Sequence, residues 1–114
     1  MNLRYLKYCE DIRKACEEIE SFMAMVKDGE DYKANLAIRR AVERSLEICG
    51  EATKQLLDEF PTTPFPGAPR IIGLRNRLIH GYAAVDDDRI WSIVVTYLPD
   101  LKATVLKLME EANA

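Results

Sequence analysis

The sequence is poor in the residues that build metal sites and covalent cross-links. Its 114 residues include one histidine and three cysteines, and no two cysteines have the Cys-x-x-Cys spacing of a zinc ligand pair. The odd number of cysteines, with no apolar leader at the N-terminus, predicts free and mostly buried thiols in the reducing cytoplasm. We therefore expect neither a metal nor any other cofactor.

Long apolar runs and an excess of positive charge are also missing. No stretch is long enough to span a bilayer, which predicts a protein without a membrane segment. The formal net charge is −3, whereas a general electrostatic binder of nucleic acid is normally basic. Any contact with RNA or phosphate must therefore come from a local basic patch.

What the sequence does contain is helical periodicity. With 48% hydrophobic residues the chain can fill one core, so we expect a single domain over residues 1–114. Apolar residues recur at spacings of three and four over about 3–27, 31–59, 71–80 and 87–112, which predicts helices there. Together these segments predict an all-α fold, an antiparallel bundle of four or five helices.

Glycine and proline mark the expected breaks and crossings. Gly29 suits the end of the first helix, and Gly81 suits the end of the third. Gly50, inside the second helix, predicts a close crossing with another helix because glycine has no side chain. Four prolines exclude a helix interior over 61–69, and Pro99 predicts that the last helix either kinks or stops and restarts.

Three consecutive aspartates, Asp86, Asp87 and Asp88, precede the last predicted helix. Carboxylates at a helix start accept hydrogen bonds from free backbone N–H groups and interact favourably with the helix dipole. A metal site is the alternative, but adjacent carboxylates at a helix start point in different directions. We therefore prefer the interpretation that they cap the helix.

The reactive groups of the chain are concentrated in residues 75–82, Arg-Asn-Arg-Leu-Ile-His-Gly-Tyr. His80 is the only histidine, and an imidazole can both take and give a proton near neutral pH. Arg75 supplies a permanent cation that can hold a phosphate through two hydrogen bonds. At about 100° per residue, His80 lies roughly 140° around a helix from Arg75, on the side of Asn76 and Arg77.

RNA cleavage requires a base, an acid and a cation that stabilises the charged phosphorane. With one histidine per chain, an acid and base pair of two histidines arises only across a symmetric dimer. Two facing copies of this helix would also bring up to four arginines together. The alternative is that His80 only interacts with the helix dipole or with solvent.

Residues 75–82 resemble the Arg-x-x-x-x-His-x-Tyr motif of HEPN-domain proteins, in particular the HepT toxin family. The resemblance covers most of the chain, because residues 41–52 resemble the family's second helix, 71–74 lead into the motif, and 85–91 resemble the start of the next helix. It implies an HEPN-like fold. It also implies a metal-independent endoribonuclease toxin that acts on RNA as a homodimer, with the two motifs facing across the interface.

The same resemblance implies roles for individual residues. Arg75 and His80 would be catalytic, and Asn76 and Arg77 would support them by holding the phosphate or orienting the histidine. The implied partner is a cognate minimal nucleotidyltransferase antitoxin that adenylylates Tyr82. A bulky anionic nucleotide at that position would occupy the phosphate site and repel RNA. Alternatively, Tyr82 is an aromatic anchor for the helix end.

Two other functions stay open at this point. A non-catalytic HEPN module would use the motif to bind a nucleotide or the partner nucleotidyltransferase, without cleaving RNA. A plain helical dimerisation domain would use the same helices only for association.

Overall fold

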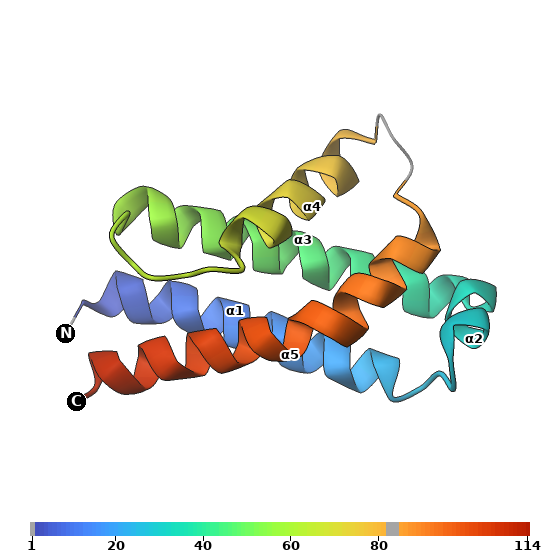
Figure 1. The fold of residues 1–114 in the computed structure, drawn as a ribbon, viewed down its shortest axis with the longest axis horizontal. Helices are drawn as coiled ribbons and strands as arrows, with labels where there is room; N and C mark the ends of the chain where they lie inside the picture. The colour runs from blue at the N-terminus through green and yellow to red at the C-terminus, as the bar shows by residue number, and fades with distance from the viewer. Residues whose placement is uncertain (1, 82–84) are drawn as a thin grey trace.

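The computed structural model describes residues 2–81 and 85–114, and in these residues it contains five α-helices and no strand. The helices are α1 (Leu3–Met23), α2 (Gly29–Ala34), α3 (Leu36–Glu59), α4 (Ala68–His80) and α5 (Asp87–Ala112). Helix α1 packs antiparallel against both α3 and α5 (Figure 1). Helix α4 lies on α3, and the C-terminal end of α4 diverges from α5 (Figure 1). The predicted all-α bundle of four or five helices is confirmed.

The core lies where α1 faces α3 and α5. The predicted apolar seam of α1 is fully buried at Cys9, Ile12, Cys16 and Ile19. All three cysteines are free and buried, as the composition predicts. Burial raises the pKa of the Cys9 thiol to about 11. A hydrogen bond with Cys16, together with burial, raises the pKa of the Cys49 thiol well above its ordinary value.

The end of the first helix differs from the prediction. Helix α1 ends at Met23 rather than near residue 27. Gly29 begins α2 instead of ending α1, because the carboxylate of Asp28 caps α2 by accepting a hydrogen bond from the N–H of Asp31 at 2.9 Å. The glycine has a packing role as well, since a Cβ at this position would lie 3.3 Å from Nε1 of Trp91.

The predicted second helix, 31–59, is divided at Asn35. This residue has an extended backbone, so α2 ends before it, and its side chain accepts a hydrogen bond from the N–H of Ile38 at 3.0 Å to begin α3.

At Pro99, by contrast, the helix is not divided. Helix α5 is continuous through the proline, so the predicted alternative of a stop and restart is wrong, and α5 changes direction along its length (Figure 1).

The three aspartates at the start of α5 have three different partners. Asp86 caps the helix by accepting a hydrogen bond from the N–H of Asp88 at 2.8 Å. Asp87 pairs with Arg39 at 2.9 Å, and Asp88 pairs with Lys33 at 3.2 Å. The capping interpretation is confirmed, and the pairs tie α5 to α2 and α3.

Candidate active site

Helix α4 carries the motif that the sequence singles out. It begins at Ala68 rather than near residue 71, because Pro69 is tolerated in the first turn, where its missing N–H is not needed. Ile71 and Leu74 are buried on the side that faces α3, as their spacing predicts. The helix ends before Gly81, whose φ of 64° is in the left-handed region that favours glycine.

Helices α3 and α4 cross closely at Gly50. A Cβ at residue 50 would lie 2.9 Å from the carbonyl oxygen of Ile71 and would collide with the Cβ of Arg75. Only glycine allows the two backbones to approach this closely. The predicted close crossing at Gly50 is confirmed, and it brings the motif helix against α3 at Arg75.

The same crossing sets Arg75 beside Glu51 of α3. Their side chains form an ion pair, and Nη1 of Arg75 donates a hydrogen bond to Oδ1 of Asn76 at 3.1 Å. The side chain of Arg75 is 21% exposed, so it lies at the border of the packed surface. A guanidinium held in this way keeps further N–H groups available for an anion.

The sequence alone assigns no role to Glu51. The available signal is its position directly after Gly50 in the chain. A carboxylate next to a helix crossing acquires a partner only once the crossing helix is known, and here that helix presents Arg75. Glu51 is therefore a site residue that the tertiary structure adds.

The other motif residues lie elsewhere around α4. His80 is exposed and is the last residue of the helix, where the helix dipole favours a cation. Arg77 is exposed and lines a hollow between α4 and α5, roughly 200° around the helix from Arg75. The structure thus joins Arg75 with Asn76 and turns Arg77 toward α5. Tyr82 lies outside the described residues.

A hollow of about 240 Å³ opens beside Arg75, where α1, α3 and α4 meet. Two large apolar side chains at this hollow are exposed, Ile48 to 38% and Ile79 to 44%. The complete lining consists of Asp11, Arg44, Glu47, Ile48, Glu51, Ala52, Gln55, Arg75 and Ile79. The surface around Arg75 therefore combines charges of both signs with exposed apolar groups.

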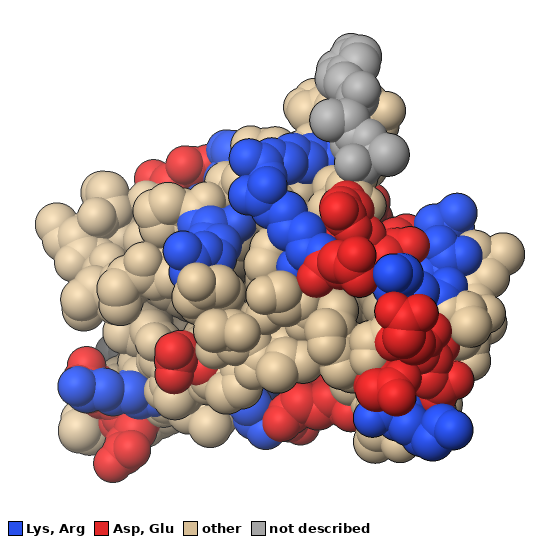
Figure 2. Space-filling view, turned by 45° about the vertical axis from the view of Figure 1, so that its right-hand side comes forward, with Lys and Arg blue, Asp and Glu red and all other residues tan. Residues whose placement is uncertain are grey.

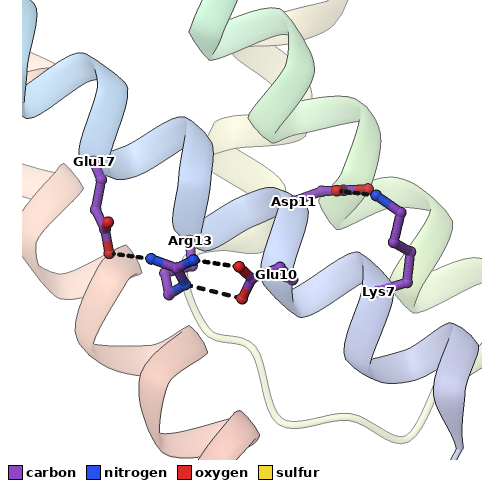
Figure 3. A network of polar contacts seen from close by, with 5 residues as sticks. All are labelled: Lys7, Glu10, Asp11, Arg13 and Glu17. Carbon is purple, nitrogen blue, oxygen red and sulfur yellow. Dashed lines mark hydrogen bonds and ion pairs between the residues drawn. The ribbon is translucent and has the colours of Figure 1, made fainter.

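On α1, acidic side chains near this hollow and farther along the helix form ion pairs with basic side chains of the same helix (Figure 3). Asp11, which lines the hollow, accepts a hydrogen bond from Nζ of Lys7 at 2.6 Å. Arg13 donates hydrogen bonds to both Glu10 and Glu17, and its bond to Glu10 lowers the pKa of that carboxyl group. These α1 carboxylates are thus neutralised locally, and the ion-pair partner of Arg75 is Glu51.

Within residues 2–81 and 85–114, no group of three or more His, Cys, Asp or Glu side chains is arranged to hold a metal ion. The cysteines, which could serve as soft ligands, are buried in the core. No helix in this described part of the chain is long and apolar enough to cross a membrane.

The sequence is similar to ribonucleases over most of its length. A family model described as "Ribonuclease HepT-like" matches residues 12–108. A Thermococcus cleftensis protein named "Probable ribonuclease HepT" is 36% identical over 112 residues, which cover 95% of this chain and 98% of that protein. A Methanocaldococcus jannaschii protein named "Putative RNase MJ1380" is 36% identical over 97 residues, 83% of this chain and 87% of that protein. No solved structure matches the chain significantly.

Proposed function

The chain belongs to the HepT-like family of ribonucleases, and from this premise we propose that it is an endoribonuclease that cleaves RNA with Arg75 and His80. The observation that carries the proposal is the anchoring of Arg75. Glu51 and Asn76 hold a permanent cation at the border of the packed surface, on the same short helix as the only histidine. Phosphodiester cleavage requires a fixed cation and a side chain, such as an imidazole, that can accept and donate a proton.

In the proposed reaction, the imidazole of one His80 removes the proton from a ribose 2′-hydroxyl, and the 2′-oxygen attacks the adjacent phosphorus. The bond from phosphorus to the 5′-oxygen breaks, and the imidazolium of a second His80 gives its proton to that oxygen. Arg75 donates hydrogen bonds to the non-bridging oxygens, on which negative charge accumulates in the transition state. The products are a 2′,3′-cyclic phosphate and a 5′-hydroxyl end, and the step is metal-independent.

The second histidine in this scheme comes from a second copy of the chain, because the sequence contains only one. We assign the homodimer interface to the face of α3 and α4 that surrounds Arg75. Ile48 and Ile79 are exposed there, and their burial would favour association. Asn76 orients the guanidinium of Arg75, with which it already forms a hydrogen bond. Arg77 supplies a further contact to the phosphate backbone.

The proposed enzyme is the toxin of a pair whose antitoxin is a minimal nucleotidyltransferase. The phenolic oxygen of Tyr82 would attack the α-phosphate of ATP and release pyrophosphate, which leaves an adenylyl group on the tyrosine. Tyr82 follows His80 by two positions, so the added phosphate would bring negative charge next to the site and repel RNA. The support for this regulation is the sequence motif and its resemblance to the toxin family.

The test measures cleavage of a fluorescently labelled RNA in the presence of a metal chelator. We expect Arg75→Ala and His80→Ala to lower the rate by at least about 100-fold, the usual contribution of an acid or base group. Arg4→Ala is the matched control, because Arg4 is an exposed arginine at the start of α1 that pairs with Glu59 at the end of α3, and it does not line the hollow beside Arg75. Unchanged cleavage by the His80→Ala protein would remove His80 from the mechanism.

Two further readouts separate the proposal from its alternatives. Analytical ultracentrifugation at micromolar concentration should show a dimer, and a strictly monomeric enzyme would contradict the shared site. If the wild-type protein cleaves no RNA under any condition, with or without its partner, the chain is instead a non-catalytic module that binds a nucleotide or the nucleotidyltransferase. Mass spectrometry after co-expression with the partner should find an added adenylyl group on Tyr82.

A further inference from the structure

The groove between α4 and α5 gathers arginine side chains. Arg70 and Arg77 of α4 and Arg89 of α5 line one hollow of about 610 Å³, together with Ser92 and Tyr97, and we call this surface the arginine groove. Its volume is within the range of about 300–1,000 Å³ that is typical of ligand sites. Figure 2 shows positive side chains close together on the face of the molecule below the end of α4.

The arginines of this groove differ from the others in their ion pairing. Six of the nine arginines pair with a carboxylate within the described part of the chain: Arg4, Arg13, Arg39, Arg40, Arg44 and Arg75. The remaining three are Arg70, Arg77 and Arg89, which are all exposed and all line the arginine groove. Within the described residues, the arginines that form no ion pair therefore lie together on one surface, although the net charge of the chain is −3.

Arg70 is held in place by an aromatic ring. Its guanidinium carbon lies 3.6 Å from the centroid of the Tyr97 ring, which is a cation–π contact. This stacking orients the planar group and leaves its N–H edges available, the arrangement in which arginine binds phosphate through two hydrogen bonds. Tyr97 also presents a large aromatic ring at the border of the groove, and this residue is 39% exposed.

An apolar cavity adjoins the arginine groove. It has a volume of about 310 Å³ and shares Arg70, Ile93 and Tyr97 with the groove. Cationic groups beside apolar and aromatic surface are what single-stranded nucleic acid requires, because its phosphates are charged and its bases are flat and apolar on their faces. An acidic protein segment would use the arginines but would have no need of the cavity beside them.

We infer that the arginine groove binds the phosphate backbone of single-stranded RNA and leads the strand to the end of α4. The identity of the ligand rests on the proposed function. Arg77 and His80 are separated by roughly 60° around the helix and by about 4.5 Å along its axis. A strand held by Arg77 therefore passes beside His80, whereas Arg75 approaches the phosphate from the other side of α4.

The experiment measures the affinity of the protein for a single-stranded RNA oligonucleotide with 2′-O-methyl riboses. This oligonucleotide cannot be cleaved, because its 2′-oxygens are blocked. Binding is followed by fluorescence anisotropy between 0.05 and 0.3 M salt, on the order of the concentrations at which counterion release is measured. The test protein is the double variant Arg70→Gln/Arg89→Gln. The control is Lys14→Gln/Lys107→Gln, which removes the same charge from exposed positions on α1 and α5 outside the groove.

Each lost phosphate contact should weaken binding about five-fold at 0.1 M salt and lower the slope of log K against log salt by about 0.7. We therefore expect about 25-fold weaker binding by the Arg70→Gln/Arg89→Gln protein, and binding close to that of the wild type by the control. Circular dichroism verifies that both variants keep their helices. Equal affinity and equal slope for the two double variants would overturn the inference. This is also the result expected if the groove binds an acidic protein surface instead of RNA.

Failure of the inference is distinguishable from failure of the proposed function. Binding is measured on an oligonucleotide that cannot be cleaved, whereas the catalytic assignment is measured by cleavage in the His80→Ala protein. If the groove variants lose binding while His80→Ala still cleaves, the groove is supported and the catalytic role of His80 fails. If His80→Ala is inactive and the groove variants bind normally, the groove fails and the catalytic proposal is retained.

Discussion

Replacing Gly50 with alanine tests the close crossing of α3 and α4, on which the position of Arg75 depends. The new Cβ would lie 2.9 Å from the carbonyl oxygen of Ile71, whereas ordinary contacts begin at 3.4 Å, and it would collide with the Cβ of Arg75. Both contacted atoms are fixed to the α4 backbone, so the helices must separate. Overpacking of this kind costs up to about 3 kcal/mol, and the better helix propensity of alanine returns about 1 kcal/mol. We expect the free energy of unfolding to fall by about 2 kcal/mol.

Gly73 provides the matched control for this substitution. It lies in α4, and a Cβ there would meet no atom within 4 Å, so Gly73→Ala should gain about 1 kcal/mol from helix propensity alone. Urea unfolding followed by circular dichroism measures both variants, at one protein concentration because the proposed dimerisation would make stability depend on concentration. The two variants should differ by about 3 kcal/mol. Equal stabilisation by the two alanines would refute the close crossing and, with it, the placement of Arg75 beside Glu51.

The remaining predictions concern Glu51 and the buried thiols. Glu51→Gln removes the charge that holds Arg75, so we expect kcat for RNA cleavage to fall by up to about 100-fold with little change in KM, and Glu51→Asp to recover part of the loss. An unchanged kcat would show that Glu51 does not position Arg75. Burial raises the pKa of Cys9 to about 11 in the folded chain, from an ordinary value of 9.0. The unfolded chain therefore loses this proton first, and the free energy of unfolding should fall by about 2–3 kcal/mol as the pH rises through this interval. Urea unfolding at a series of alkaline pH values measures this, and Cys9→Ala should flatten part of the fall; stability that is independent of pH in the wild type would contradict the burial argument.

Local sequence patterns are sufficient for most of the fold. The spacing of Cys9, Ile12, Cys16 and Ile19 predicts the buried face of α1 because the helical period relates positions that are close in the chain. The N-cap at Asp86 and the positive φ at Gly81 are equally local, since each depends on the chemistry of one residue and its immediate neighbours. These features are confirmed at or near the predicted positions.

The deviations occur where contacts between distant residues decide the outcome. The apolar spacing continues across Asn35, so periodicity predicts one helix, but α2 turns away to bury Tyr32 with its ring centroid 5.8 Å from that of Trp91. At Pro99 the local rule predicts a disturbed helix, at a cost of about 3 kcal/mol. Leu98 and Leu101 are buried on either side of it, and each fully buried leucine contributes about 1.5–3 kcal/mol, which offsets that cost.

The motif residues 75–80 lie on a helix, as the sequence predicts. The side chains that surround them are determined by the tertiary structure. The sequence by itself determined that Arg75, Arg77 and His80 share a short helix, and the helical repeat sets the angles between them. Which neighbour each side chain meets depends on how α4 crosses α3, and that crossing depends on the missing side chain of Gly50. The crossing pairs Arg75 with Glu51 and turns Arg77 toward α5. Angles within a helix are local, whereas the partners of its faces are set by packing between segments far apart in the chain.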